Sequence, residues 1–359
     1  MVTDTSERAL ETIIVNDMLK SGWKAGNWPD YEREYCVDLA QLTEFIKSTQ
    51  PDLVESLSLE QDTNTRRKFL ARLKSEISKR GIIDILRHGV KHGYHQIELF
   101  YGTPSPGNPA AIEMFSQNRF SVTRQLHYSL DETRRALDLG LFINGLPIAT
   151  FELKNNLTKQ TVEDAVEQYK RDRDPREKLF EFGRCVVHFA VDDQGVKFCT
   201  HLKGKVSWFL PFNKGWNDGA GNPPSEGIKT DYLWKEVLTP TSLTNILENY
   251  AQIIEEKDEK TGRKKKKQIW PRYHQLDVVR KLLIDLTHDG VGKRYLIQHS
   301  AGSGKSNSIA WLAHQLIGLQ KDEKRIFDSI IVITDRIVLD RQINQTIKQY
   351  TQVRATIGH

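Results

Sequence analysis

Three ionisable residues near the middle of the chain have the types and spacing to act together on a phosphate. Thirteen residues separate Asp138 from Glu152, and a single residue separates Glu152 from Lys154. Two carboxylates can supply the hard oxygen ligands that Mg²⁺ prefers, and the metal can neutralise a phosphate and activate a water. A lysine ammonium can orient that water and offset charge that develops in the transition state. The three residues could therefore carry out metal-dependent phosphodiester hydrolysis.

A hairpin must bring these side chains together. Asn144 and Gly145 lie between two apolar runs, which is a strong hairpin signal. Glu152 and Lys154 are two residues apart on the second strand and share a face. A strict two-residue turn would put Asp138 on the opposite face, whereas a three-residue loop with a bulge would pair position 138 with position 150. We therefore expect a bulge or an odd-length loop in this hairpin.

This arrangement resembles the PD-(D/E)xK nucleases. The resemblance implies an α/β domain with a mixed sheet flanked by helices, in which Asp138 and Glu152 bind the metal and Lys154 is the catalytic lysine. The short pattern alone has a plain alternative, because charged residues two apart are common on a solvated strand face.

The predicted helix at 161–173 offers two further polar residues. Gln168 and Arg171 lie on the side away from the apolar positions and could reach a phosphate backbone. Nucleases of this class often have a Gln-x-x-x-Tyr on this helix, but position 172 is Asp and the tyrosine is Tyr169. A solvated helix face is an equal alternative.

Other candidates have simpler interpretations. Glu7 and Glu11 could add a carboxylate to the site, but negative charge near a helix N-terminus is the more ordinary role. His188 alternates with apolar residues and is expected to be a satisfied core histidine, and His201 has no neighbour at metal-ligand spacing. The three cysteines are expected to be small apolar fillers.

A second group of residues indicates nucleotide binding. The run Ala301-Gly302-Ser303-Gly304-Lys305-Ser306 matches a Walker A loop between a predicted strand and a predicted helix. In such loops the backbone amides hold phosphates, the lysine reaches the terminal phosphates, and the serine binds Mg²⁺. Upstream, Gln275 in WPRYHQ resembles the adenine-reading Q-motif of superfamily 2 helicases, and Asp335-Arg336 resembles the start of their motif Ia near the DNA path.

Apolar periodicity predicts the elements that hold these residues. Helices are expected at 5–22, 64–89, 161–173, 278–288, 305–320 and 338–350, and strands at 97–101, 137–154, 185–191, 294–299 and 329–334. Strands that alternate with helices after residue 270 predict a parallel sheet. The almost wholly charged segment Glu255–Lys267 is expected to be an exposed linker, and residues 213–227 a loop.

Composition narrows the class of protein. Hydrophobic residues make up 38% of the 359 positions, enough for packed cores. No apolar run is long enough to cross a membrane, and the first residues do not resemble a secretory signal. Three scattered cysteines exclude a disulfide scaffold and favour the cytoplasm. A formal net charge of +5 permits nucleic-acid binding without establishing it.

Taken together, the chain resembles the R subunit of type I restriction-modification enzymes. The matching stretches are GIIDILRHGVK (81–91), LFINGLPIATFELKN (141–155), QYKRDRDP (168–175), FLPFNKG (209–215), GAGNP (219–223) and WPRYHQLDVV (270–279). The resemblance implies a nuclease domain at 1–250, a charged linker at 251–269, and the first part of a RecA-like superfamily 2 helicase domain at 270–359.

The same resemblance implies an Mg²⁺- and ATP-dependent site-specific deoxyribonuclease that translocates double-stranded DNA and assembles with methyltransferase and specificity subunits. We expect poor ATP hydrolysis by residues 1–359, because no acidic Walker B strand or second lobe precedes His359. A nucleotide- and DNA-binding assembly module with an inactive nuclease site remains the alternative.

Overall fold

The computed structural model describes residues 7–104, 107–131, 134–155, 159–217, 219–257, 262, 264–321, 324–334, 343 and 346–347. The chain divides into two compact units, residues 1–253 and 254–359. The expected helix at 338–350 and the dipeptide Asp335-Arg336 lie outside the described residues, apart from positions 343, 346 and 347.

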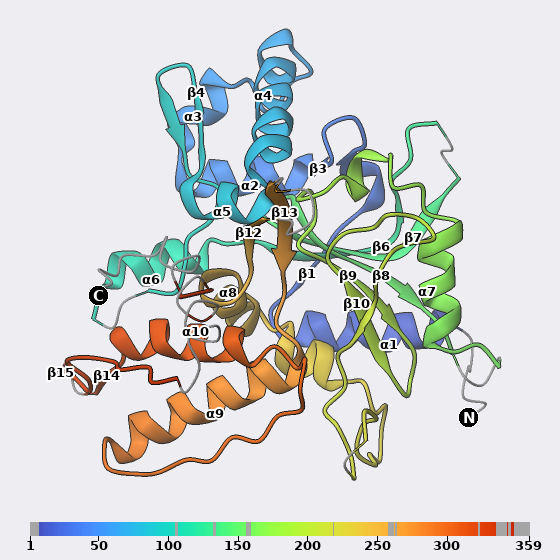
Figure 1. The fold of residues 1–359 in the computed structure, drawn as a ribbon. Coiled ribbons are helices and arrows are strands. Elements are labelled where there is room, and N and C mark those ends of the chain that lie inside the picture. The colour runs from blue at the N-terminus through green and yellow to red at the C-terminus, as the bar shows by residue number, and fades with distance from the viewer. Residues whose placement is uncertain are drawn as a thin grey trace. The chain divides into compact units, whose positions relative to one another are not determined.

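The first unit surrounds a seven-stranded mixed sheet (Figure 1). The strand order is β1-β6-β7-β8-β9-β10-β11, and the bounds are β1 (Lys24–Ala25), β6 (Phe120–His127), β7 (Ala136–Ile143), β8 (Leu146–Leu153), β9 (Val187–Val191), β10 (Val196–Cys199) and β11 (Leu210–Pro211). β1 pairs with β6 and β8 with β9 in parallel, and the other neighbours are antiparallel. Within this unit the mixed α/β architecture agrees with the prediction.

Helices and small hairpins surround the sheet. The helices are α1 (Glu7–Lys20), α2 (Leu39–Thr49), α3 (Pro51–Ser56), α4 (Asn64–Arg80), α5 (Ile82–His88), α6 (Pro109–Ser116), α7 (Val162–Arg171) and α8 (Pro240–Asn249). The hairpins pair β2 (Tyr31–Glu32) with β3 (Val37–Asp38) and β4 (Val90–His92) with β5 (His95–Ile97). Short 3₁₀ turns lie at Trp28–Asp30 and Lys178–Phe180, and a π-helical turn at Leu233–Val237.

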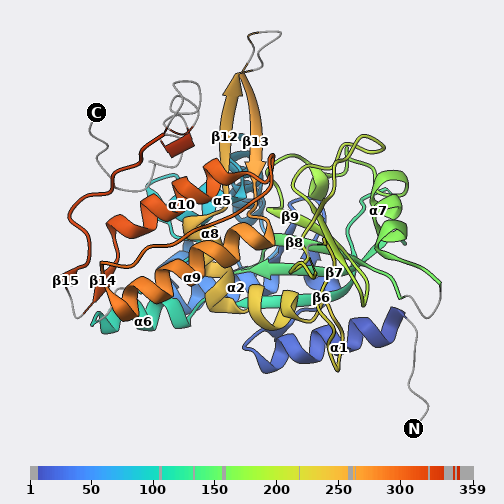
Figure 2. The same cartoon turned by 60° about the horizontal axis from the view of Figure 1, so that its bottom comes forward.

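Helices α1 and α7 pack on opposite faces of the sheet (Figure 2). Glu11 of α1 contacts Arg124, which is paired with Leu139 and so shares the face of Phe151. Tyr169 of α7 contacts Thr150 on the other face. Strand β8 is consequently buried on both sides. Its polar residues Thr150 and Glu152 therefore lie in the interior rather than on a solvated face.

Two local expectations in this unit are refined by the structure. The region expected to be helical at 64–89 is helical but divided in two, because Gly81 adopts φ +84° and ends α4 before α5 begins. The strand expected at 97–101 ends at Ile97. Beyond it, the side-chain amide of Gln50 donates to the Glu98 carbonyl at 2.8 Å and accepts from the Glu98 amide at 2.9 Å. The Gln50 side chain thus makes the two backbone hydrogen bonds that a neighbouring strand would make with Glu98.

The second unit contains two packed helices, α9 (Tyr273–Asp289) and α10 (Lys305–Ile317), and two short strands, β14 (Gln320–Lys321) and β15 (Lys324–Arg325). The expected strands at 294–299 and 329–334 are not formed in the described residues, so the predicted parallel sheet is absent there. An extended segment becomes a strand only when its amides and carbonyls pair with a neighbour. Leu296 and Ile333 are instead 94% and 88% exposed.

The charged segment is also not simply a linker. β12 (Gln252–Lys257) and β13 (Lys264–Ile269) form a two-stranded sheet. Lys264 pairs with Glu255 at 3.0 Å and Lys267 with Glu256 at 3.3 Å. The acidic run on one strand thus faces the basic run on the other, and opposite charges across a strand pair stabilise it.

Candidate functional site

The β7–β8 hairpin contains the expected bulge, but in a different place. Asn144 and Gly145 form a two-residue turn with φ +51° and +79°, and Ile143 pairs directly with Leu146. The register then shifts, because Phe142 pairs with Pro147 whereas Leu141 pairs with Ala149. The extra residue is therefore Ile148. Pro147 has no amide hydrogen to donate to the ladder, and proline in a sheet is typically found at such bulges.

This shift brings the three predicted residues together. Leu139 pairs with Phe151 in the antiparallel ladder. One residue further along, Asp138 therefore lies opposite Glu152. Asp138 is half-buried, and its Oδ2 accepts a hydrogen bond from the Leu153 amide at 2.7 Å. Glu152 is fully buried and Lys154 is 8% exposed, with its amide bonded to the Val191 carbonyl at 2.9 Å. Both charges act on the pKa of Glu152, which Asp138 raises and Lys154 lowers.

An arginine that we did not predict completes this group. Arg173 lies just beyond α7, and its Nε donates to Glu152 Oε1 at 2.6 Å. The same guanidinium donates to the Ala136 carbonyl at 2.8 Å and lies over the ring of Tyr128. Arg173 belongs to the QYKRDRDP stretch, but its type and position alone gave no reason to pair it with Glu152. The contact depends on how α7 ends above β8.

The electrostatics of Glu152 follow from its burial. Loss of solvent raises the pKa of Glu152 to about 8, and the Arg173 guanidinium opposes this shift. Glu152 Oε2 is buried and has no hydrogen-bond partner among the described residues. A buried oxygen of this kind fits a cation ligand, since such a group is otherwise costly. Asp138 and Glu152 could thus hold a divalent metal, although no cluster of three or more acidic, His or Cys side chains surrounds them in the described residues.

On the same face of the sheet, three uncharged polar side chains are joined by hydrogen bonds. Thr150 Oγ1 lies 2.8 Å from both the Tyr169 hydroxyl and His188 Nδ1. Burial lowers the pKa of His188 to about 3, so the ring is uncharged at neutral pH. His188 is a satisfied core histidine, as the sequence predicted. Tyr169 likewise packs in the core.

The remaining nuclease candidates belong to helices α7 and α1. Gln168 is half-buried on α7, and Arg171 forms a 2.9 Å ion pair with Glu167. Arg171, Glu167, Lys170 and Lys205 line a cavity of about 430 Å³. Glu11 is buried and accepts from Arg124 and Gln125 at 2.5 and 2.7 Å, so its role is not that of a simple helix-terminal charge. The side chain of Glu7 lies outside the described residues.

The predicted nucleotide loop has the turn that a phosphate site needs. Gly302 and Gly304 adopt φ +73° and +82°, and α10 begins at Lys305. Its first amides point away from the helix and need an external acceptor. Lys305 Nζ donates to the carbonyls of His299 and Ser300 at 3.1 and 3.0 Å. Ala301 is exposed, Ser303 buried and Ser306 half-buried.

Gln275 contacts this loop directly. Its Nε2 donates to the carbonyls of Ser303 and Gly304 at 3.1 and 2.9 Å, while its Oε1 accepts from the Arg272 amide at 2.8 Å. A Cβ at Gly304 would come within 2.4 Å of this amide nitrogen, so a side chain at this position would displace the Gln275 amide. The Nε2 end of the amide thus joins Gln275 to the loop, while the Oε1 end bonds to the start of its own helix.

Comparison with known proteins gives two family matches. Residues 4–206 match the model of the type I restriction enzyme R protein N terminus, and residues 274–357 match that of the SWI2/SNF2 ATPase. The type I restriction enzyme HindI endonuclease subunit of Haemophilus influenzae is 24% identical over 361 residues, which cover 95% of this chain and 32% of that protein. The putative type I restriction enzyme MjaVIIIP endonuclease subunit of Methanocaldococcus jannaschii is 28% identical over 221 residues, 58% of this chain and 19% of that protein.

The chain therefore spans about a third or less of the length of these relatives. Within the described residues, none of the helices has the length and apolar character needed to cross a membrane.

Proposed function

Because this chain belongs to the family of type I restriction enzyme R protein N termini, we propose that residues 1–250 are a PD-(D/E)xK endonuclease domain that cuts double-stranded DNA. The hairpin bulge at Ile148 gives the strongest support. Without this extra residue, Asp138 would face away from Glu152. The bulge interrupts an otherwise regular ladder, and bulges commonly re-aim a side chain beside an active site.

The proposed chemistry assigns a role to each residue of the group. Asp138 and Glu152 would hold Mg²⁺ through carboxylate oxygens, of which Glu152 Oε2 has no hydrogen-bond partner among the described residues. When bound, the metal polarises the scissile phosphate and makes its water a better nucleophile. Lys154 would use its ammonium to orient that water and to offset the growing negative charge. The apolar surroundings of β8 strengthen both interactions by excluding solvent.

An alternative function has a specific observation in its favour. Arg173 occupies one oxygen of Glu152, and the carboxylate is fully buried. A site closed in this way would suit a nucleotide- and DNA-binding assembly module with no nuclease activity. The two functions differ in whether the group binds a divalent metal.

Metal binding and DNA cleavage together test the proposal. We expect Asp138→Asn and Glu152→Gln to abolish Mn²⁺ binding to the chain, measured by calorimetry, and nicking of supercoiled plasmid by the complete subunit. Lys154→Gln should preserve metal binding but lose cleavage by a factor of about 10² or more. Glu163→Gln, which removes an exposed carboxylate on α7, is the matched control. Cleavage that survives all three changes would contradict this assignment of the site, whereas a complete subunit that neither binds Mn²⁺ at this group nor cuts DNA would favour the assembly module.

For residues 270–359 we propose the first part of a RecA-like ATPase domain that drives DNA translocation. The loop at 301–306 would bind the phosphates of MgATP through its amides and Lys305, with Ser306 on the metal. Gln275 would link adenine recognition to the loop through its contacts with Ser303 and Gly304. The match to the SWI2/SNF2 ATPase model supports this assignment.

We further propose that this chain acts within a type I restriction complex that includes methyltransferase and specificity subunits. The supporting observation is its similarity to endonuclease subunits of such enzymes. Co-purification of the complete subunit with those two proteins tests the assembly.

A further inference from the structure

Positive charge is concentrated in one short part of the first unit. Residues 64–96 contain nine lysines and arginines but only two acidic residues, Glu76 and Asp84. Their formal charge of +7 exceeds the +5 of the entire chain, so the rest of the protein is slightly negative. We call residues 64–96 the basic arm. It comprises α4, α5 and the β4–β5 hairpin, and includes the GIIDILRHGVK stretch, which has no role in the proposed chemistry.

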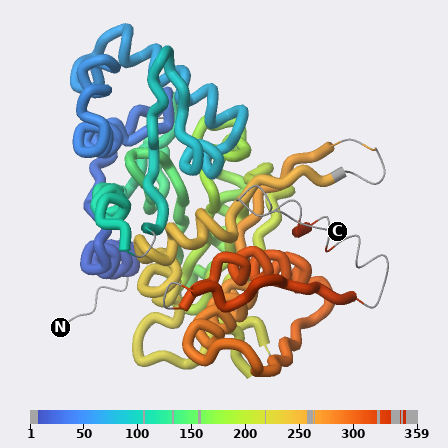
Figure 3. Tube along the Cα trace, turned by 90° about the vertical axis from the view of Figure 1, so that its left-hand side faces the viewer, coloured from blue at the N-terminus to red at the C-terminus, as the bar shows by residue number. Residues whose placement is uncertain are grey.

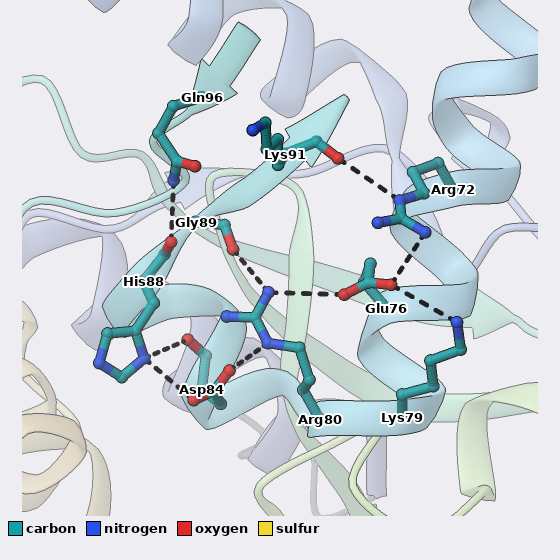
Figure 4. A network of polar contacts seen from close by, with 9 residues as sticks. All are labelled: Arg72, Glu76, Lys79, Arg80, Asp84, His88, Gly89, Lys91 and Gln96. Carbon is teal, nitrogen blue, oxygen red and sulfur yellow. Dashed lines mark hydrogen bonds and ion pairs between the residues drawn. The ribbon is translucent and has the colours of Figure 1, made fainter. Parts of the chain in front are cut away.

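A network of polar contacts holds the hairpin of the basic arm against α4 (Figure 4). Arg72 Nε donates to the Lys91 carbonyl at 3.4 Å, and Arg80 Nη1 donates to the Gly89 carbonyl at 3.1 Å. Across the hairpin, Gln96 Nε2 donates to the His88 carbonyl at 2.9 Å. These bonds reach backbone carbonyls rather than flexible side chains. The hairpin and the helix therefore present their charges side by side.

Acidic residues neutralise only part of this charge. Glu76 is shared by Arg72, Lys79 and Arg80 at 3.1, 3.7 and 3.6 Å. Lys68 and Lys91 are exposed and have no carboxylate partner among the described residues. Lys68, Arg72 and Lys79 recur at helical spacing along one side of α4, a stripe of about 16 Å at 1.5 Å per residue.

The exposed side of the basic arm is almost without apolar surface. Phe69, Leu73 and Ile77 point inward and are buried. Tyr94, at the tip of the hairpin, is the exception and is fully exposed. Gly93 adopts φ +58° in the two-residue turn and makes this tip tight. Figure 3 shows the hairpin alongside α4.

We propose that the basic arm binds the phosphate backbone of double-stranded DNA outside the cleavage site. Clustered cations on one helix and an adjoining hairpin are the electrostatic pattern of a nucleic-acid surface. Tyr94 adds a polar-tipped ring that contacts sugar or groove edges. This inference deepens the proposed function, on which it rests for the identity of the polyanion.

An acidic protein partner fits the basic arm less well. The centre of a stable protein interface is rich in apolar and aromatic residues and poor in charge. On the basic arm Tyr94 is the one large exposed residue of that kind among those described, and it lies at an edge. Phosphate contacts need no apolar centre, because release of counterions drives the binding.

Binding of a short labelled DNA duplex to the 359-residue chain, measured by fluorescence anisotropy in EDTA, tests the inference without cleavage. We expect the variant Lys68→Gln/Lys91→Gln to bind about tenfold or more weakly at ~0.1 M salt, with the slope of log affinity against log salt reduced by about two. Tyr94→Ala should weaken binding without changing the slope. Circular dichroism should show that all variants stay folded.

The control Lys20→Gln/Lys235→Gln removes the same charge from another part of the first unit and should bind DNA as the unchanged chain does. Equal losses in both double variants, or none in either, would overturn the inference. So would loss of binding to poly-L-glutamate with duplex binding intact, which would indicate an acidic protein partner. Lys68→Gln/Lys91→Gln should still bind Mn²⁺ as the unchanged chain does. Failure of the nuclease proposal is therefore distinguishable from failure of this one.

Discussion

At Glu152 the two oxygens of one buried carboxylate have different environments. Oε1 is bonded to Arg173, whereas Oε2 has no partner among the described residues. The sequence predicted Glu152 and its neighbours because a strand fixes which residues share a face. Arg173 could not be predicted in this way, because its position depends on the packing of α7 over the sheet. Short-range spacing thus identifies the group, and tertiary packing determines its charge balance.

The Glu152–Arg173 pair should be strongly coupled in stability. We expect Arg173→Met to lower the free energy of unfolding by about 3 kcal/mol, because it leaves a buried carboxylate without its counter-charge. Glu152→Gln should lower the free energy of unfolding by less, since Arg173 keeps its bond to the Ala136 carbonyl. The double variant should lose less than the sum of the two in urea denaturation.

Arg176→Met is the control for that experiment. Arg176 pairs with Asp174 at the same 2.6 Å, but its side chain is exposed. Such an exposed pair contributes little to stability, because solvent screens its attraction. Equal losses at Arg173 and Arg176 would contradict the importance of burial.

His188 should make the protein sensitive to acid. Its pKa is lowered to about 3 in the folded state, whereas an unfolded histidine titrates near 6.5. Between these values the unfolded state binds the additional proton, so stability is present above pH ~6.5 and is lost as the pH falls toward 3. Between pH 7 and 5 the protonation of this one residue in the unfolded state should lower the free energy of unfolding by about 2 kcal/mol.

Urea denaturation at both pH values measures this loss. In His188→Asn the decrease between pH 7 and 5 should be smaller by about 2 kcal/mol, whatever the stability at pH 7. The exposed His95→Asn should behave as the unchanged chain does. An identical decrease in the His188 variant would show that other groups cause the acid sensitivity.

At the scale of the element, the hairpin shows what local sequence can and cannot predict. Asn144-Gly145 identifies the turn, and the need to align Asp138 with Glu152 predicts a bulge. Its location at Ile148 follows from the missing amide hydrogen of Pro147, which the register argument did not consider. The hairpin β12–β13 makes the complementary point, because low apolar content predicted a linker where cross-strand ion pairs formed strands.

Gly145 should be essential to the hairpin for two reasons. It adopts φ +79°, and a Cβ there would lie 2.3 Å from the Asp38 carbonyl oxygen and 2.8 Å from the Leu42 amide. We expect Gly145→Ala to destabilise the first unit by about 3 kcal/mol, of which about 1 kcal/mol is backbone strain.

Gly93→Ala separates these two contributions. Gly93 also lies in a two-residue hairpin turn at positive φ, but a Cβ there would meet nothing within 4 Å. Gly93→Ala should therefore lower the stability only by the backbone strain, about 1 kcal/mol. Similar losses in the two variants, measured by thermal unfolding, would mean that the contact with Asp38 and Leu42 is not restrictive.

At the scale of the whole molecule, the two units differ in how far their folds follow from local pattern. The first unit gathers most of its strands in one seven-stranded sheet, so alternation and burial predict most of its core. In the second, helices α9 and α10 follow their apolar periodicity, but the runs at 294–299 and 329–334 find no strand partner among the described residues. Helices satisfy their own backbone groups and strands do not, which explains why only the helices were predicted correctly.

This division predicts where a nucleotide should act. The loop at 301–306 and Gln275 belong to one unit, and Asp138, Glu152 and Lys154 belong to the other. In hydrogen exchange on the 359-residue chain, MgATP should protect amides near 299–308 and 272–276 and leave those at 136–154 unchanged. At a hundred times its dissociation constant the nucleotide should stabilise the unit that binds it by about 2.7 kcal/mol. Lys305→Ala should remove this protection, whereas Lys293→Ala, an exposed lysine of the same unit, should retain it. Protection that also extends over 136–154 would show that the nucleotide and the candidate nuclease group are energetically linked in this chain.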